Sequence, residues 1–583
     1  MPDLSRLLPS KSDKIRALVY ETHPLWAHAH TKILEDNGCV VTHVDNVDDA
    51  MYLMQACYFQ IIILMDQNNP LFKTIYKYRW YDYTVVCVCS EGLLEFGNDL
   101  YLRFGERETV IRMNEILLSS KRKFYPTEFW QRIERELIEK ELIGRLYIER
   151  PDFITDLSYQ MTNNLIEHIE ASNIHNELNS QDQWIKSYYE SQDEKSRYEA
   201  LRSRVEYEIF DLLRRCVKGY NIDAIQLSPI VSGLSKAAVI GITPKINGRT
   251  ALPLVLKLGY HKEIAQEAYA YENHVQFMLQ RIPKAVEGPR TPLLSSMIYT
   301  KVEKGKSFGE VYQDEYLFPT YKVEALLEDL FRNTCHKWFS TSKEAMVEAV
   351  DYMGYLNCQL KRFIDPIEHL QKQPMMHGYY LWSDNFRLPT IDRLFANPFN
   401  YLEDDDFLTM LNYSAPRTIT HGDMNANNIL IRNDDEAWLI DFGRTDYHHA
   451  LRDFIQLETV VRFALMEGVS LAERYEMESW LTSQTKFAHI TKISQEFVPS
   501  SPQVERAFRI TCKIRELAWE TVLSNQDDTQ QFAKFKQYQM GLFFMSLTTV
   551  RFVKHHRAPN GLSTTQALHA LMAASLLGEQ LAR

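Results

Sequence analysis

Apolar residues follow different spacings along the chain, and the pattern changes near residues 120 and 220. Up to residue 120, short apolar runs alternate with segments that are apolar at every third or fourth position. The runs IRALVYE, FQIIILMD and TVVCVC have the length of buried strands. Strands that alternate with helices predict a doubly wound α/β domain with a parallel sheet over residues 1–120.

Residues 121–221 are charged and rich in helix formers. The stretches RIERELIEKELIGRLYIER and KSRYEALRSRVEYEIFDLLRRC carry apolar residues at helical spacing, with Glu and Arg on the other faces. This pattern predicts a helical connector, which is also a candidate contact for a homodimer.

Strand patterns return over residues 222–302. IQLSPIV, VIGIT and LPLVLKLG are apolar runs, and Asn247-Gly248 between the last two is a strong hairpin signal. Lys257 is the one charge in the run PLVLKLGY. A lysine in a buried strand needs a partner for its charge. The alternative is an edge strand, from which the lysine reaches water.

Residues 303–583 are mostly helical, except for the stretch RTITHGDMNANNILIRNDDEAWLIDFG at 417–443. It predicts strand, polar loop, strand, turn and strand. Three polar side chains then lie at the ends of rigid elements: Asp423, Asn428 and Asp441. Phosphoryl transfer needs a carboxylate that orients the attacking hydroxyl, which suits Asp423. It also needs hard oxygen ligands for Mg²⁺, which suits Asn428 and Asp441. The alternative is a hairpin whose carboxylates only cap turns.

This stretch resembles the catalytic core of the aminoglycoside phosphotransferase and choline kinase-like group of the protein-kinase-like fold. The HGD-x4-N loop of that group matches His421-Gly422-Asp423 with Asn428, and its metal-binding Asp before Phe-Gly matches Asp441. The following LRDFIQLETVVRF resembles kinase-like domains of the ternary complex-associated type. The resemblance implies a bilobal kinase-like domain with a small lobe at 222–302, a large lobe at 303–583 and a hinge at 297–302.

The same resemblance implies a nucleotide site for ATP or GTP with Mg²⁺. Lys257 would contact the phosphates and pair with an acid on the next helix. Glu267 is the first choice for that acid, Glu263 the second, and Glu272 fits less well. A flexible loop covering the phosphates is expected at Ser232, Gly233 and Ser235, although a plain β-turn explains these three residues equally well. His421 is expected to brace the loop and Asp453 to anchor the helix that follows.

The first domain resembles a response-regulator receiver, which makes the expected fold class multidomain α/β plus α+β. Glu21 and Asp66 end apolar runs and fall at the carboxyl edge of the sheet, where sites lie. The second acid after the first strand is replaced by Thr22, and Arg103 stands where a lysine is expected. Because this acidic set is incomplete, a degenerate receiver used for dimerisation or docking is favoured over phosphorylation of Asp66.

Composition restricts the partners of the chain. Its 583 residues carry a net charge of −12, which argues against a broad nucleic-acid surface. Eight cysteines have no CxxC spacing, and Cys87 and Cys89 are expected to pack in a core. The adjacent His448 and His449 lack further ligands for a metal. The sequence shows no secretory signal and no apolar run of membrane-spanning length, so a cytoplasmic protein is expected.

The acceptor is expected to be small. Gly422 replaces the arginine that protein kinases use to bind a phosphorylated activation loop, and no long activation segment follows Asp441. Both features favour a small-molecule hydroxyl or another compact acceptor. An insertion near residues 373–398 contributes aromatic residues that either line a pocket or pack under the loop, namely Tyr379, Tyr380, Trp382 and Phe386. The competing function is a catalytically weak, nucleotide-binding signalling or assembly module.

Overall fold

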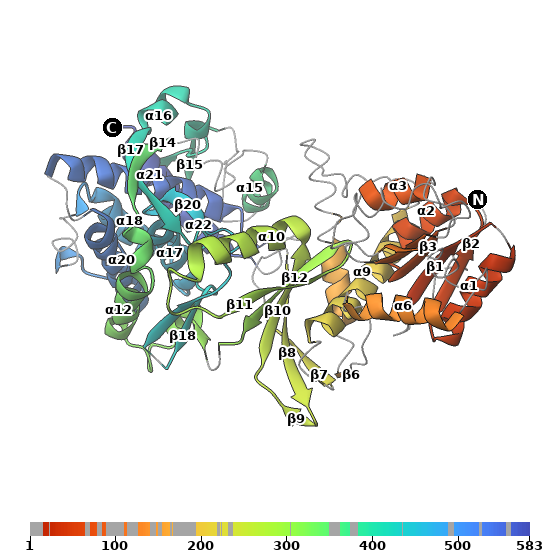
Figure 1. Ribbon diagram of the computed structural model, residues 1–583. Helices are drawn as coiled ribbons and strands as arrows, with labels where there is room; N and C mark the ends of the chain where they lie inside the picture. Colours follow the sequence, from red (N-terminus) through yellow and green to blue (C-terminus); the bar gives the residue numbers. More distant parts are fainter. Residues whose placement is uncertain are drawn as a thin grey trace. The chain divides into compact units, whose positions relative to one another are not determined.

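The computed structural model describes most of the chain, and the elements of the fold are shown in Figure 1. The described residues are 15–22, 24–64, 70–77, 84–88, 110–112, 126–139, 147–149, 154–163, 166, 194–217, 222, 224–230, 237–302, 305–348, 362–372, 383–433, 435–487, 495–523, 528–554 and 561–583. The chain forms two compact units. The first comprises Met1–Ala265 and Ala285–Lys301, and the second comprises Gln266–Lys284 and Val302–Arg583. The chain crosses between the units at 265–266, 284–285 and 301–302, and the last of these crossings lies inside the stretch expected to be the hinge.

The first unit begins with a parallel sheet, as the alternating pattern predicts. Its strands are β1 (Arg16–Tyr20), β2 (Val40–Val44), β3 (Ile61–Leu64), β4 (Val85–Val88) and β5 (Val110–Arg112). All neighbours are parallel and the order is β2-β1-β3-β4-β5. This order reverses between β1 and β3, which is the switch point of a doubly wound sheet.

Alternate residues of these strands face two different helical layers. Ala17, Val19, Ile61 and Ile63 pack with helices α1 (Pro24–Asp36) and α6 (Pro126–Glu139). Their neighbours pack with α2 (Val47–Ala56), α3 (Pro70–Lys77) and α9 (Glu194–Cys216). A strand covered on both faces is apolar throughout, which explains the continuous runs in the sequence. By its packing, α6 belongs with this sheet, although it follows the boundary expected near residue 120.

A second, largely antiparallel sheet completes the first unit. Its order is β11-β12-β10-β8-β7-β6, with β9 paired to β8. The strands are β6 (Tyr147–Glu149), β7 (Ala224–Pro229), β8 (Ala238–Ile246), β9 (Arg249–Thr250), β10 (Leu254–Tyr260), β11 (Ala285–Arg290) and β12 (Leu294–Thr300). The turn between β8 and β9 has positive φ at Asn247 and Gly248, as the hairpin signal requires.

Helix α9 joins the two sheets of the first unit. One continuous apolar core contains residues of the parallel sheet, α9 and the antiparallel sheet. A buried ion pair crosses this core: Arg204 donates to Glu208 at 3.0 Å and to the Met54 carbonyl at 3.2 Å. Glu208 also accepts from the Thr291 hydroxyl at 2.6 Å and the Leu293 amide at 2.9 Å. The predicted connector helix is therefore an internal element of the unit.

The described residues of the second unit form helices and three small antiparallel sheets, which pair β13-β18-β19, β14-β17-β20 and β15-β16. Helix α10 (His261–Ala270) leads into it. Its other elements are η3 (Tyr271–Val275), β13 (Lys306–Ser307), α11 (Phe308–Gln313), α12 (Thr320–Glu328), η4 (Asp329–Thr334), α13 (His336–Phe339), β14 (Lys343–Val347), α15 (Ile364–Gln371), β15 (Asn385–Arg387), β16 (Leu394–Ala396), η6 (Asn400–Leu402), α16 (Asp405–Met410), β17 (Tyr413–Thr420), β18 (Ile429–Arg432), β19 (Glu436–Leu439), β20 (Asp446–His449), α17 (Arg452–Thr459), η7 (Val460–Leu465), α18 (Leu471–Ser483), α20 (Pro502–Ala518), η9 (Trp519–Leu523), α21 (Asp528–Val550) and α22 (Thr564–Leu581).

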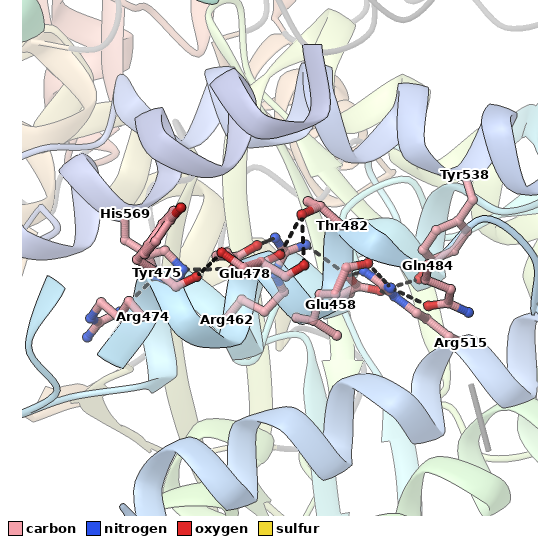
Figure 2. Close-up of polar contacts among 12 residues, drawn as sticks. Glu458, Arg462, Arg474, Tyr475, Glu478, Thr482, Gln484, Arg515, Tyr538 and His569 are labelled. Atoms are coloured by element: carbon pink, nitrogen blue, oxygen red, sulfur yellow. Dashed lines mark hydrogen bonds and ion pairs between the residues drawn. The ribbon is translucent and has the colours of Figure 1, made fainter. Parts of the chain in front are cut away.

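A buried network of charged side chains lies among the helices of this unit (Figure 2). Glu458 of α17 accepts from Arg462 at 2.8 Å, from the Arg515 Nε and Nη2 atoms at 3.0 and 2.8 Å, and from the Tyr538 hydroxyl at 2.7 Å. Arg462 also pairs with Glu478 of α18. Because every charge here is removed from water, the pairing must be complete to be tolerated.

His569 of α22 closes one end of this network as a neutral ring (Figure 2). Its Nδ1 atom lies 2.9 Å from the Arg474 guanidinium and its Nε2 atom 2.7 Å from Glu478. Guanidinium nitrogens only donate, so Nδ1 accepts and Nε2–H donates to the carboxylate. Burial lowers the pKa of His569 to about 4, although Glu478 acts in the opposite direction. Burial also opposes ionisation of Glu478, but Arg462 and His569 outweigh it and lower that pKa to about 2.

Acidification is expected to destabilise the second unit from about pH 6.5 downward. The unfolded chain binds a proton at His569 near pH 6.5 and the folded chain only near 4, so stability is complete above 6.5 and falls toward pH 4. The loss from this histidine is about 3 kcal/mol at pH 4. Glu478 adds a further loss between its unfolded value of 4.5 and about 2. Calorimetric melting of the full chain from pH 7 to 4 checks this, and His569→Gln should show a weaker pH dependence.

Two further observations concern helix length and the cysteines. No helix in the described ranges is both long and apolar enough to cross a membrane. The cysteines that the structure describes are buried and are not joined in disulfides, namely Cys39, Cys57, Cys87, Cys216, Cys335 and Cys512.

Candidate active site

The stretch at 417–443 forms the predicted succession of strands and loops. β17 ends at Thr420, the loop 421–428 follows, and β18 pairs antiparallel with β19 through Ile429↔Leu439. Asn433, in the turn between them, has a positive φ of 53°. The hairpin therefore places Asp423 in the loop before β18 and Asp441 two residues after β19.

Asn428 is oriented by a hydrogen bond to the backbone of the proposed base. Its Nδ2 atom donates to the Asp423 carbonyl at 2.8 Å, and its side chain is buried. Since the nitrogen end of the amide is held in this way, the Oδ1 atom is the end suited to a cation. The Asn428 carbonyl also accepts from the Ile440 amide at 3.0 Å, which ties this loop to the segment that carries Asp441.

Asp441 has an unusual backbone conformation. Its φ is +65°, a region that residues other than glycine rarely adopt. Such strain is concentrated at functional sites, where the surrounding structure enforces it. The preceding residue is held by His421, whose Nε2 atom lies 2.9 Å from the Ile440 carbonyl, and the His421 ring packs against Phe442 at 5.4 Å. His421 thus braces the loop, as expected.

Gly422 occupies a position that no other residue fits without rearrangement. Its φ is +75°, and a Cβ atom built on it would lie 2.2 Å from the Arg444 carbonyl oxygen. The arginine of protein kinases is therefore excluded here by the backbone itself. The close approach also joins the loop to the segment that follows Asp441.

Asp453 of α17 binds the loop directly. Its two carboxylate oxygens accept from the His421 amide at 2.7 Å and the Gly422 amide at 2.9 Å. The side chain is fully buried, and burial raises its pKa, against the opposing effect of His421 and the two amides. Asp453 was expected to anchor this helix, and the two contacts show how it does so.

Two further residues of α17 escaped the sequence analysis. The Arg452 guanidinium donates to the Gly422 carbonyl at 2.9 Å. The Gln456 amide donates to the same carbonyl at 3.1 Å and accepts from the Met424 amide at 3.0 Å. Both side chains are buried. The signal available in LRDFIQLETVVRF was the spacing of Arg452, Asp453 and Gln456, which places these three polar side chains on one face of a helix.

Lys257 lies in the first unit, on an interior strand. β10 is hydrogen-bonded to β8 through Lys257↔Val239 and to β12 through Lys257↔Met297. The lysine side chain is 7% exposed. The edge-strand alternative is therefore wrong, and the buried amine needs a partner for its charge.

Of the acids proposed to pair with Lys257, Glu267 is the most buried, at 2% exposed. Glu263 is half-buried and Glu272 is exposed. Within the second unit, the Glu267 carboxylate lies beside the segment after Asp441: a Cβ atom at Gly443 would be 3.6 Å from Glu267 Oε2 and 3.7 Å from Asp441 Oδ1. The pairing of Glu267 with Lys257 stays a prediction.

Several other predicted residues fall outside the described part of the chain. These are Ser232, Gly233 and Ser235 of the expected phosphate loop, Asp66 and Arg103 of the receiver-like domain, Cys89, and three aromatics of the insertion (Tyr379, Tyr380 and Trp382). Glu21 is described; it follows β1 directly and is buried. Phe386 packs against Phe395 with ring centroids 5.4 Å apart, which makes it a core residue.

His448 and His449 are structural. The His449 ring forms two hydrogen bonds. Its Nδ1 atom accepts from the Leu451 amide at 3.1 Å, and its Nε2 atom lies 3.3 Å from the Gln537 side-chain oxygen. Burial lowers the pKa of both histidines to about 3, so both are neutral at pH 7. No group of three or more His, Cys, Asp or Glu suited to a metal occurs among the described residues. A magnesium site made by Asn428 and Asp441 would supply two protein ligands and leave the remaining positions to phosphates and water.

Comparisons with known proteins agree with the resemblance expected from the sequence. Residues 384–538 match the family model of ternary complex associated domain 9. A comparison with curated protein sequences gave no match. Among solved structures, a thermostable mutant of aminoglycoside phosphotransferase APH(4)-Ia, in a ternary complex with ADP and hygromycin B, matches at 12% identity. The match covers 58% of this chain and 96% of that one, with a TM-score of 0.28.

Two further solved structures belong to the same broad group. Choline kinase LicA from Streptococcus pneumoniae matches at 12% identity over 60% of this chain and 93% of that one, with a TM-score of 0.31. An ethanolamine kinase from Plasmodium vivax matches at 12% identity over 68% and 92%, also with a TM-score of 0.31. Because these TM-scores are low, the proposals below rest on the chain's own residues. The chain is distantly similar to small-molecule kinases, and its residues 384–538 match ternary complex associated domain 9.

Proposed function

We propose that the chain is a Mg²⁺-dependent phosphotransferase that moves the γ-phosphate of ATP or GTP to a hydroxyl of a small or compact acceptor. One observation carries this proposal: a single braced frame holds Asp423, Asn428 and Asp441. Asn428 donates to the Asp423 carbonyl, and its own carbonyl accepts from the residue before Asp441. A base and two hard oxygen ligands fixed in one frame are the set that phosphoryl transfer requires.

Each residue has a distinct role in the proposal. Asp423 orients the acceptor hydroxyl and accepts its proton. Asn428 and Asp441 would hold Mg²⁺, which neutralises charge on the phosphates when bound. Lys257, paired with Glu267, would contact the phosphates from the small lobe, and the loop containing Ser232, Gly233 and Ser235 would cover them.

The acceptor is proposed to be compact because the described segment between Asp441 and α17 is too short to form a platform for a peptide. Gly422 and the close approach of Arg444 leave no room for the arginine that binds a phosphorylated activation loop. From Asp441 the chain passes through β20 into α17, which begins at Arg452. A long activation segment has no place in this short connection.

The test measures binding and turnover on the full chain with MgATP and MgGTP. A nucleotide that binds the folded state should raise the melting temperature, and omission of Mg²⁺ should remove most of that shift. Phosphate release should be measurable with water or an added hydroxyl compound as the acceptor. Asp441→Asn should lose the Mg²⁺-dependent part of the shift, since a carboxylate ligand becomes neutral. Mg²⁺-dependent stabilisation that is equal in Asp441→Asn and wild type would contradict the proposed metal ligands.

A second candidate is a catalytically weak, nucleotide-binding assembly module with a receiver-type dimerisation domain. Two observations favour it: the matched family is described as ternary complex associated, and α9 places the N-terminal sheet and the antiparallel sheet in one core. A module of this kind would bind the nucleotide and release no phosphate. Light scattering of the full chain with and without MgATP would then report a change in assembly.

A further inference from the structure

The side chain of Gln456 bridges the backbone on both sides of Asp423. Its Nε2 atom donates to the Gly422 carbonyl at 3.1 Å, and its Oε1 atom accepts from the Met424 amide at 3.0 Å. Gly422 and Met424 are the immediate neighbours of Asp423 in the chain. The glutamine is 4% exposed, so neither contact competes with bulk water.

These two contacts hold the two peptide planes that meet at the Asp423 Cα atom. The Gly422 carbonyl belongs to the peptide before this atom, and the Met424 amide to the peptide after it. Rotation about φ of Asp423 moves the first plane relative to the Cα atom, and rotation about ψ moves the second. A side chain that holds both planes therefore fixes φ and ψ of Asp423, and with them the direction of its Cα–Cβ bond.

Each of the other contacts described for this loop holds the backbone on one side of Asp423. Asn428 and the Asn425 amide donate to the Asp423 carbonyl, which belongs to the second plane, at 2.8 Å each. Asp453 holds the amides of His421 and Gly422, which lie before the first of the two planes. Arg452 donates to the Gly422 carbonyl, so this bond holds the first plane and not the second. Among the hydrogen bonds described for α17, those of the Gln456 side chain hold the backbone on both sides of Asp423.

The helix that carries Gln456 is itself held firmly. Two residues further along α17, Glu458 accepts from Arg462, Arg515 and Tyr538 in the buried network (Figure 2). Asp453, three residues before Gln456, is bound to the loop. The helix that carries Gln456 is thus held by the core of the unit as well as by the loop.

We infer that Gln456 is a positioning residue that sets the direction of the Asp423 carboxylate, an inference that rests on the proposed role of Asp423 as the base. Gln456 does not touch the reacting atoms. It acts by holding the backbone, so its loss allows the carboxylate to turn away from the acceptor, while the Asn428 carbonyl still accepts from the Ile440 amide. Misplacement of a reacting group by about 1 Å can cost about 10²-fold in rate.

The test compares phosphate release from MgATP by the full-length wild type, Gln456→Met, Asp423→Ala and the double variant. Gln456→Met should lower kcat by about 10²-fold and change KM for MgATP by less than about threefold. In the Asp423→Ala background the same substitution should have little further effect, because the group that it positions is gone. Gln539→Met is the matched control: Gln539 is also buried and donates to a backbone carbonyl, that of Gln484 at 3.2 Å. It should retain wild-type kcat.

A second variant keeps the test decisive if Gln456→Met folds poorly. Gln456→Glu retains an acceptor for the Met424 amide but, when ionised, places a carboxylate oxygen against the Gly422 carbonyl. Protonation restores the donor, so the rate of this variant relative to wild type should rise several-fold as the pH falls from 8 to about 5.5.

The outcomes separate the two claims. Additive losses in the double variant, or a constant ratio of Gln456→Glu to wild type across pH, would overturn the positioning role while Asp423 remains the base. Full activity of Asp423→Ala, or no phosphate release by wild type, would overturn the proposed function and this inference together.

Discussion

Asp423→Asn is expected to lower the rate of phosphoryl transfer by about 10³-fold, the middle of the range for loss of a general base. This corresponds to about 4 kcal/mol of transition-state stabilisation. The amide keeps the size and the backbone contacts of the aspartate but cannot accept the proton of the acceptor hydroxyl. Because Asn428 binds the Asp423 carbonyl and not its side chain, the metal ligands should keep their places. Single-turnover phosphate release and the Kd of MgATP measure the two effects separately.

Asp435→Asn is the matched control for this substitution. Asp435 lies in the turn between β18 and β19 of the same hairpin and is exposed. It undergoes the same chemical change without contact with the catalytic loop, so turnover should equal that of wild type. If Asp423→Asn retained wild-type turnover, Asp423 would not be the base, and the assembly module would become the better account of the chain.

Glu458→Ala is expected to destabilise the second unit by about 3–5 kcal/mol, the cost of breaking a buried charge network by removing one partner. The carboxylate accepts from two arginines and a tyrosine, and its removal leaves Arg462 and Arg515 as buried cations with fewer partners. Arg515 retains only neutral acceptors among its described contacts, the Leu481 carbonyl and the Gln484 side chain. The melting temperature of the second unit should fall by about 10 °C.

Helix α20, which carries Arg515, also provides a control for this effect. Arg509 of α20 forms an ion pair with Glu324 at 3.0 and 3.1 Å, and its side chain is 46% exposed. Glu324→Ala should cost less than about 1 kcal/mol, since water replaces the lost partner. Scanning calorimetry of the full chain compares the two variants. Equal decreases in melting temperature for the two variants would show that burial does not decide how much these ion pairs contribute to stability.

The catalytic hairpin could be predicted from the sequence because its signals are local. Turn residues, apolar strands and the polar loop occur within 27 consecutive positions. The three strands form in the expected order and β18 has the expected bounds, but β17 begins earlier, at Tyr413, and β19 ends at Leu439 where the pattern extends it to Phe442. The parallel sheet could also be predicted from the sequence, since continuous apolar runs indicate strands that are covered on both faces.

Contacts between segments that are distant in the chain could not be predicted from the sequence. The helical pattern of α6 is the same whether the helix connects domains or covers a sheet, so its packing against β1 and β3 could not be derived from it. The interior position of Lys257 depends on which strands flank β10, and its sequence does not contain that information. The roles of Arg452 and Gln456 arise only when α17 meets a loop about thirty residues earlier in the chain.

The shared core around α9 determines how the chain can be shortened. Leu201, Val205, Ile209 and Leu212 of this helix are buried in a core that also contains strand residues from both sheets of the first unit. Removal of the first 120 residues would uncover one side of this helix, and a truncated chain with that much newly exposed apolar surface should aggregate. The N-terminal domain is thus not expected to be a detachable accessory, because the antiparallel sheet that carries Lys257 shares one core with it.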